Sequence, residues 1–167
     1  MSSTEASRSP LVGEITNEWL ETLLTRHMKV SGFRGVYPCD LIPRLEHGES
    51  SIVNTDPADQ PGWHYTSLYK RKGCYYYFDP LALHLPISFP RLWRELHQRK
   101  IIPRRVLKQP IQAQGSRFCG LFCAVYILSI SVEYKNVSRE TYYLDEHDLQ
   151  RNNETVMDNI LKCIESL

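Results

Sequence analysis

QAQGSRFCGLFCAVYILSISVEY, residues 112–134, is the stretch that decides the fold. It opens with polar, turn-forming residues and is then apolar on nearly every side of a helix from Leu121 to Ile130. A helix that is apolar all round has to lie at the centre of a domain. Cys119 stands at the junction, at about the third position of a helix that Ser116 would cap. The stretch therefore predicts a buried central helix with a cysteine near its N-terminal end.

Cys119 admits two interpretations, a small apolar residue of the core or a reactive thiolate. A free thiol is a poor nucleophile at neutral pH because most of it is protonated. The partial positive charge of a helix N-terminus and a nearby imidazolium both stabilise the thiolate. The position of Cys119 suits this second interpretation. Cys123 lies one helical turn further in, and we expect it to be buried in the core.

The rest of the chain predicts one α+β domain over residues 13–167, preceded by a flexible tail at residues 1–12. The amphipathic segment 14–29 predicts a helix with Thr16 or Asn17 as its N-cap. The glycines and prolines of residues 31–45 predict an irregular loop. The remaining expected elements are a strand at 50–55, a hairpin of strands 64–70 and 74–79, a basic amphipathic helix at 89–100, a strand at 104–112 and a helix within 148–167.

His64 is the best candidate for the base that a cysteine nucleophile needs. It follows the turn sequence DQPGW and opens an apolar strand, and the end of a strand is a rigid place for a general base. If the two hairpin strands pair, Asp79 returns beside His64 and can orient its imidazole. Taken singly, each also fits a plainer role, His64 as an edge-strand residue and Asp79 as a turn residue before Pro80.

An attacked carbonyl develops negative charge on its oxygen and needs preorganised hydrogen-bond donors. The backbone N–H of Cys119 is one donor by position. Gln112, seven residues earlier, offers a side-chain amide at the end of the strand expected before the helix. Gln114 competes for this role. A zinc site made by Cys119, Cys123 and either His64 or Cys39 fits poorly, because the two cysteines lie inside an apolar helix, and we expect no metal or other cofactor.

Charge is balanced overall but uneven along the chain. The 167 residues carry 20 Lys and Arg against 19 Asp and Glu, for a net charge of +1, so no global field indicates nucleic acid or a membrane. Residues 91–108 hold seven basic side chains and only Glu95 to oppose them. They predict either a solvated face or a surface for an anionic partner. The N-terminal residues lack an apolar signal core, and five cysteines without such a signal indicate a reduced, intracellular protein.

Three segments, taken in order, resemble a known family. VNTDPADQPGWHY (53–65), YYYFDP (75–80) and IQAQGSRFCGLFC (111–123) are similar to the adenovirus-type cysteine proteases (adenain), in the wider clan of the SUMO-deconjugating proteases. Similar sequences occur in Polinton/Maverick-type transposons and related viruses. The resemblance covers roughly residues 33–130. It implies a papain-like α+β fold, with a central helix that carries the nucleophile packed on a mixed sheet.

The resemblance also implies a role for each matched residue. It makes His64 the general base, Asp79 its orienting acid, Gln112 the oxyanion side chain and Cys119 the nucleophile, and the Gln-to-Cys spacing favours Gln112 over Gln114. We also assign Trp63 and Gly120 to substrate binding, the glycine because it lets substrate approach the backbone closely. The family usually has a tryptophan after the histidine, where this chain has Tyr65. The acid is an aspartate, as in the wider clan, where adenoviral enzymes have glutamate.

The implied activity is a thiol endopeptidase that cleaves viral or transposon-encoded precursor proteins, as in virion maturation. A deconjugating isopeptidase that acts on a ubiquitin-like protein, and a silent binding protein on the same scaffold, are the alternatives. The expected partner is a polypeptide, with a monomeric enzyme in the host nucleus or cytoplasm, or in the virion. Family members respond to DNA and to a disulfide-linked peptide. The basic stretch 91–108 permits the first, whereas no cysteine lies between Cys74 and Cys119 to allow the second.

Overall fold

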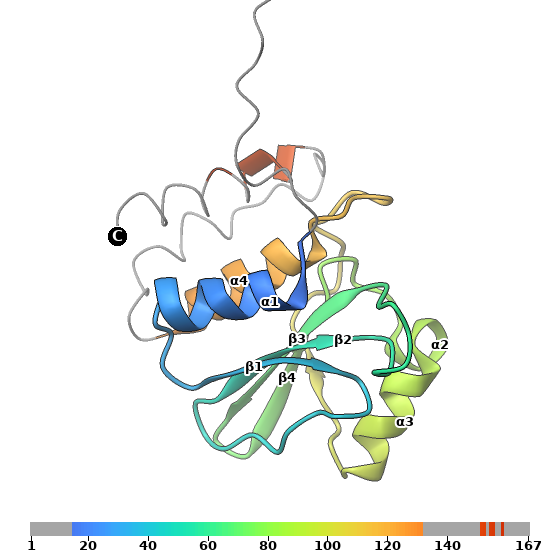
Figure 1. The fold of residues 1–167 in the computed structure, drawn as a ribbon. Helices are drawn as coiled ribbons and strands as arrows, with labels where there is room; N and C mark the ends of the chain where they lie inside the picture. Colours follow the sequence, from blue (N-terminus) through green and yellow to red (C-terminus); the bar gives the residue numbers. More distant parts are fainter. Residues whose placement is uncertain (1–14, 132–150, 153, 156–157, 159–167) are drawn as a thin grey trace, which may run out of the picture.

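The computed structural model describes residues 15–131, 151–152, 154–155 and 158. They form an α+β fold around one mixed sheet of five strands, in the order β1-β2-β3-β4-β5 (Figure 1). The outer pairs β1–β2 and β4–β5 are parallel, and the inner pairs β2–β3 and β3–β4 are antiparallel. The strands are β1 (Phe33–Pro38), β2 (Ser50–Asn54), β3 (Tyr65–Arg71), β4 (Cys74–Phe78) and β5 (Arg104–Arg105).

Helices cover both faces of the sheet. α1 (Asn17–Thr22) lies beside α4 (Cys119–Ile130) over one face, and α2 (Leu85–Ser88) and α3 (Pro90–Gln98) lie on the other side (Figure 1). Because neighbouring residues of a strand point to opposite faces, Ile52 joins the core under α1 and α4 while Val53 joins the core under α3. The predicted central helix is confirmed, since ten consecutive residues of α4 from Cys119 are buried.

The N-terminal helix begins where its sequence predicts. Thr16 is the N-cap of α1, and its side-chain oxygen accepts a hydrogen bond from Trp19 N at 3.1 Å. The helix continues as a π-helical turn, η1 (Leu23–His27). Its apolar stripe is buried against α4 and the sheet, with Leu20 and Leu24 fully covered. The stripe predicted for residues 14–29 is therefore confirmed over the described part, although its last turn is wider than an α-helix.

The prediction of an irregular loop at 31–45 is wrong for its first half, which forms the edge strand β1. Glycine and proline normally interrupt strands, but an edge position tolerates both. Gly35 has a φ of +126°, and the register with β2 shifts between Phe33 and Val36. Pro38 is the last residue of β1. Because β1 is an edge strand, the missing N–H of Pro38 removes no hydrogen bond between inner strands of the sheet.

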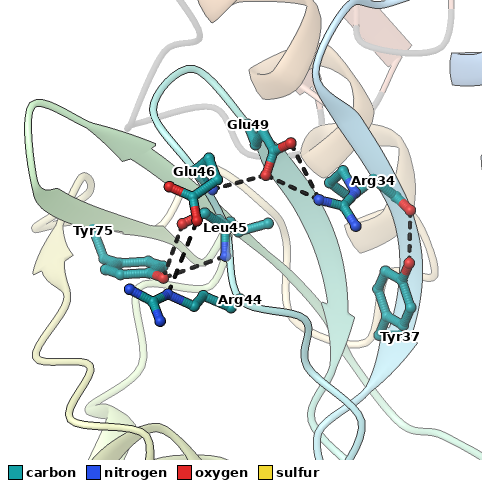
Figure 2. A network of polar contacts seen from close by, with 7 residues as sticks. All are labelled: Arg34, Tyr37, Arg44, Leu45, Glu46, Glu49 and Tyr75. Atoms are coloured by element: carbon teal, nitrogen blue, oxygen red, sulfur yellow. Dashed lines mark hydrogen bonds and ion pairs between the residues drawn. The ribbon is translucent and has the colours of Figure 1, made fainter.

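An ion pair joins β1 to the loop that leads into β2. Arg34 Nη1 lies 3.1 Å from each carboxylate oxygen of Glu49, and Glu49 also accepts a hydrogen bond from Glu46 N at 2.7 Å (Figure 2). The Glu46 N–H and Arg34 together hold the pKa of Glu49 below its usual range. In the same network, the Tyr75 hydroxyl of β4 bonds to the backbone of Leu45. These contacts fix the loop without any regular structure.

The predicted hairpin is confirmed as β3 and β4. Arg71 pairs with Cys74 across Lys72 and Gly73, which have φ values of +49° and +77°. Positive φ at both central residues is the conformation that two-residue hairpin turns require. The same hairpin brings the ends of both strands to one end of the sheet. His64 directly precedes β3 and Asp79 directly follows β4.

The basic helix is confirmed as α3, with Pro90 at its first position. The strand predicted at 104–112 is shorter than expected, since only Arg104 and Arg105 pair with β4 before the chain leaves the sheet. The predicted tail at 1–12 and most of the C-terminal segment 148–167 lie outside the described residues. No helix in the part of the chain that the structure describes is long and apolar enough to cross a membrane.

Candidate active site

His64 and Asp79 meet at the open end of the β3–β4 hairpin. His64 Nε2 lies 2.6 Å from Asp79 Oδ1, and both side chains are buried. The hairpin register pairs Ser67 with Phe78, so its continuation places Asp79 diagonally across from His64 on the same face. Diagonal neighbours are within reach of long side chains. The expected proximity of the two residues is therefore confirmed, and it follows from the length of the hairpin.

Backbone groups hold the carboxylate of Asp79 in place. Its Oδ1 accepts a hydrogen bond from Leu81 N at 2.9 Å, and its Oδ2 accepts one from Leu83 N at 3.1 Å. The turn that supplies these donors includes Ala82, which has a φ of +48°. A carboxylate that accepts two N–H bonds in addition to the imidazole has its lone pairs directed by the fold. Asp79 is thus fixed before it orients His64.

Aromatic rings surround the other sides of His64. Its ring stacks on Phe89 with centroids 5.5 Å apart, and Trp63 lies at 5.5 Å from both rings. Thr55 N donates a hydrogen bond to His64 O at 2.9 Å, which ties the backbone of the histidine to the end of β2. Phe89 is buried, whereas Trp63 is 64% exposed. The imidazole is therefore shielded on one face and bordered by an exposed indole.

The side chain of Cys119 lies near enough to the His64 ring to raise the pKa of His64. Because Asp79 occupies Nε2, Nδ1 is the ring nitrogen left for the sulfur. Burial alone would lower the pKa of His64, but the hydrogen bond to Asp79 and the neighbouring Cys119 outweigh burial and raise the pKa to about 9. The imidazole is then protonated at neutral pH. A protonated imidazole stabilises a thiolate at its side.

Cys119 is the first residue of α4, two positions closer to the helix start than predicted. Ser116 does not cap this helix, because its hydroxyl accepts a hydrogen bond from Phe118 N instead. Phe118 is the N-cap residue, and no side-chain cap bond closes the described helix start. The first-turn N–H groups of a helix lack partners within the helix and carry partial positive charge. Cys119, as the first residue of α4, lies at this end of the helix.

Cys123 is fully buried one turn below, as expected. Burial raises the pKa of its thiol well above the usual value. A thiol that stays protonated is neither a nucleophile nor a metal ligand. The two cysteines of α4 thus have different surroundings, and Cys119 is the one that raises the pKa of His64.

Gln112 is buried, with 1% of its side chain exposed. Its Nε2 donates a hydrogen bond to Ser116 O at 2.8 Å, and Oε1 has no partner among the described residues. Since the amide nitrogen carries two hydrogens, one is left for an acceptor other than Ser116. Gln114, the competing candidate, is exposed.

The two predicted substrate-binding residues differ in surroundings. Trp63 is exposed beside His64, which suits contact with a ligand. Gly120 is buried, and a Cβ there would lie 2.9 Å from Leu20 Cδ1 and 3.3 Å from Tyr65 Cδ2. Close approach of α1 and β3 to α4 therefore explains the glycine without a substrate. Its role in substrate binding stays a prediction.

Two residues of the site went unnoticed in the sequence. Phe89 forms the stacking face of His64, and Asn152 donates a hydrogen bond to Ile111 O, next to Gln112, at 2.9 Å. Neither carries a local signal, because both contacts join segments far apart in the chain. Among the described residues no group of three or more His, Cys, Asp or Glu is arranged to hold a metal ion.

Comparison with models of protein families and with curated proteins finds no match. The chemistry of the site has to be inferred from its own residues.

Proposed function

We propose that this protein is a cysteine endopeptidase of papain-like fold, with Cys119 as nucleophile, His64 as base, Asp79 as orienting acid and Gln112 as oxyanion donor. The observation that carries the proposal is the buried hydrogen bond between His64 and Asp79, next to Cys119, whose side chain raises the pKa of His64. A thiol, an imidazole and a carboxylate in this order form the arrangement used for acyl transfer.

The proposed reaction starts from a Cys119 thiolate beside a protonated His64. The Cys119 thiolate attacks the scissile carbonyl carbon, and the charge on the carbonyl oxygen is stabilised by the Cys119 N–H and the free N–H of the Gln112 amide. The His64 imidazolium gives its proton to the leaving amine, which breaks the C–N bond and leaves a thioester. Water, which gives a proton to the now neutral His64, attacks the thioester, releases the carboxylic acid product and restores the Cys119 thiolate beside the His64 imidazolium.

The proposed substrate is an extended polypeptide, and viral or transposon-encoded precursors are the class that the sequence resemblance favours. Trp63 offers an exposed indole beside the reacting groups. Large exposed aromatic side chains are frequent anchors for peptides. We therefore place the substrate chain across Trp63, with its scissile bond over Cys119.

Electrophilic probes test the proposal directly. A peptide vinyl sulfone and a ubiquitin-like protein with a C-terminal electrophile are offered side by side, and the labelled cysteine is located by mass spectrometry. We expect labelling at Cys119 that is lost in Cys119→Ala and reduced in His64→Ala. The matched control is Cys74→Ala. Cys74 is more exposed than Cys119 but is not the proposed nucleophile, so its removal should leave the labelling of Cys119 unchanged.

Equal labelling of the Cys119→Ala variant would contradict the assignment. Faster reaction with the ubiquitin-like probe than with the peptide would replace the endopeptidase by a deconjugating enzyme with the same chemistry.

The basic stretch 91–108 supports a second element of the proposal, an anionic partner such as DNA. All seven Lys and Arg side chains are exposed. Arg99 is paired with Glu95, and Arg105 donates to Ala82 O at 3.1 Å. If DNA stimulates cleavage through these charges, the stimulation should decrease steeply with added salt, because binding releases counterions. A salt-independent effect would speak against it.

A further inference from the structure

Gln112 lies in a segment without regular structure. The chain leaves the sheet after Arg105 and forms neither helix nor strand until Cys119. A strand would fix the backbone of Gln112 through ladder hydrogen bonds, as the sequence predicted. Something else has to orient this side chain, because an oxyanion donor acts only when it is held in place before the reaction.

The peptide group between Ile111 and Gln112 is held at both ends. Its N–H, that of Gln112, donates to Pro80 O at 3.1 Å, and Ile111 N donates to the same oxygen at 2.9 Å. Its carbonyl oxygen, that of Ile111, accepts a hydrogen bond from Asn152 Nδ2 at 2.9 Å. Asn152 lies 41 residues further along the chain and is only 2% exposed.

These bonds fix the direction in which the Gln112 side chain leaves the backbone. A peptide plane that is bound at both its N–H and its C=O cannot rotate, so the Cα of Gln112 keeps one orientation. The side chain then reaches Ser116 O with one amide hydrogen. The reverse amide orientation would set Oε1 against Ser116 O, two acceptors facing each other. Release of the peptide plane would therefore turn the second amide hydrogen away from the oxyanion position.

We propose that Asn152 is a positioning residue of the oxyanion hole, which acts on the reaction through Gln112 and touches no substrate. This inference rests on the proposed function. It assigns to the C-terminal part of the chain a share in transition-state stabilisation. A positioning role differs from a merely structural one, in which Asn152 would only attach its own segment to the domain.

Three variants separate these roles. Asn152→Ala removes the donor, and Asn152→Asp keeps the shape of the side chain but replaces the donating nitrogen by an oxygen. Both should lower kcat about tenfold at nearly unchanged KM, a fraction of the roughly 100- to 1000-fold that loss of an oxyanion donor costs. Thr155→Ala is the matched control, because Thr155 bonds to Arg151 O within the same segment, and its kcat should equal that of the original protein.

A double-mutant cycle and a thiol reaction complete the test. In a Gln112→Ala background, Asn152→Ala should change kcat less than twofold, because the residue through which it acts is gone. The rate of Cys119 alkylation by iodoacetamide, which needs the thiolate but no oxyanion hole, should be the same in all variants. Circular dichroism and urea unfolding show whether each variant is folded.

Each other outcome counts against one statement in particular. If the loss in Asn152→Ala adds fully to that in Gln112→Ala, or if alkylation slows in parallel with kcat, Asn152 acts on the structure as a whole and the inference fails. If Asn152→Ala matches the original protein while Cys119→Ala and Gln112→Ala are impaired, the inference fails and the proposed function stands. If Cys119→Ala leaves cleavage unchanged, the proposed function fails and the inference fails with it.

Discussion

The rings of His64 and Phe89 lie nearly parallel, with their planes 17° apart and their centroids separated by 5.5 Å. Phe89 is the N-cap residue of α3 and belongs to the core beneath the sheet. One buried side chain thus connects the start of a surface helix to the proposed base. The contact couples stability of that core to geometry of the site.

Phe89→Ala should lower both stability and activity. Loss of a buried phenylalanine side chain typically costs about 3–5 kcal/mol of the free energy of unfolding, and the imidazole loses the surface that limits its rotation. Ile87→Ala is the matched control, because Ile87 is 78% exposed in the neighbouring helix and should change stability by less than about 0.5 kcal/mol. Urea unfolding and peptide cleavage measure the two effects. Full activity in a folded Phe89→Ala protein would show that the stack has no positioning role.

Asp79→Asn should move the alkaline limit of activity to lower pH. The original protein should keep its imidazolium up to about pH 9, where His64 loses its proton. Without the carboxylate the pKa of His64 falls, so the rate should decline earlier as pH rises. We expect kcat/KM near pH 7 to fall on the order of 10- to 100-fold, less than the loss of a general base can cost. The profile of kcat/KM against pH is the measurement, and Asp59→Asn, at an exposed site, is the control. An unmoved alkaline limit would contradict the role given to Asp79.

The stability of the protein should fall between pH 6.5 and about pH 9 through His64. Its pKa is raised from 6.5 to about 9 on folding, so the folded state binds a proton that the unfolded state has released. The contribution is complete below pH 6.5 and is lost as pH rises through 9, with a size of up to about 3 kcal/mol. Urea unfolding at several pH values should show this slope, and His64→Ala should flatten it. His27→Ala, at an exposed histidine, should leave the slope unchanged.

Gly120→Ala should destabilise the protein by overcrowding. The added methyl group would lie 2.9 Å from Leu20 Cδ1 and 3.1 Å from Ile15 Cγ2, and such overpacking typically costs about 1–3 kcal/mol. Leu20→Val removes part of the obstruction, so its own cost should be smaller in the Gly120→Ala background than alone. Thermal unfolding of the original protein, the two single variants and the double variant measures this coupling. A stable Gly120→Ala protein with a raised KM would instead favour contact between Gly120 and substrate.

Trp63→Ala should weaken substrate binding more than it slows the chemical step. Because 64% of the indole is exposed, its removal leaves no buried cavity, and KM should rise several-fold while kcat changes little. Ile102→Ala provides the comparison, since Ile102 is 75% exposed after α3. Steady-state cleavage of one peptide by both variants gives the two constants. Equal KM values in the two variants would remove Trp63 from the substrate path.

Sequence patterns predicted those parts of the molecule that are encoded locally. The apolar run after Cys119 specifies α4 without reference to any other segment, and two strand-forming segments joined by the turn at Lys72 and Gly73 specify the hairpin. The pairing of His64 with Asp79 followed from the hairpin alone, because the two residues are 15 positions apart. These features need only the period of a helix or a strand.

Contacts between distant segments set the remainder. β1 forms because it pairs in parallel with β2, although it contains a glycine. No local sequence pattern predicts that pairing. The start of α4 at Cys119, rather than near Arg117, is a local exception, because it depends on the bond from Phe118 N to the Ser116 hydroxyl two residues earlier. The bond between Asn152 and Ile111 spans 41 residues. Tertiary contacts of this kind override local propensity.

The hairpin has a further consequence for how the site is lost on warming. His64 and Asp79 are joined by neighbouring strands of the sheet, whereas Gln112 lies between β5 and α4, where the backbone has no ladder. Segments with few regular hydrogen bonds open in sub-global fluctuations at lower free energy than core strands do. Amide protons of residues 106–118 should therefore exchange with solvent faster than those of β3 and β4. Such an opened molecule would keep its imidazole–carboxylate pair and nearly all its circular dichroism while it no longer turned over substrate.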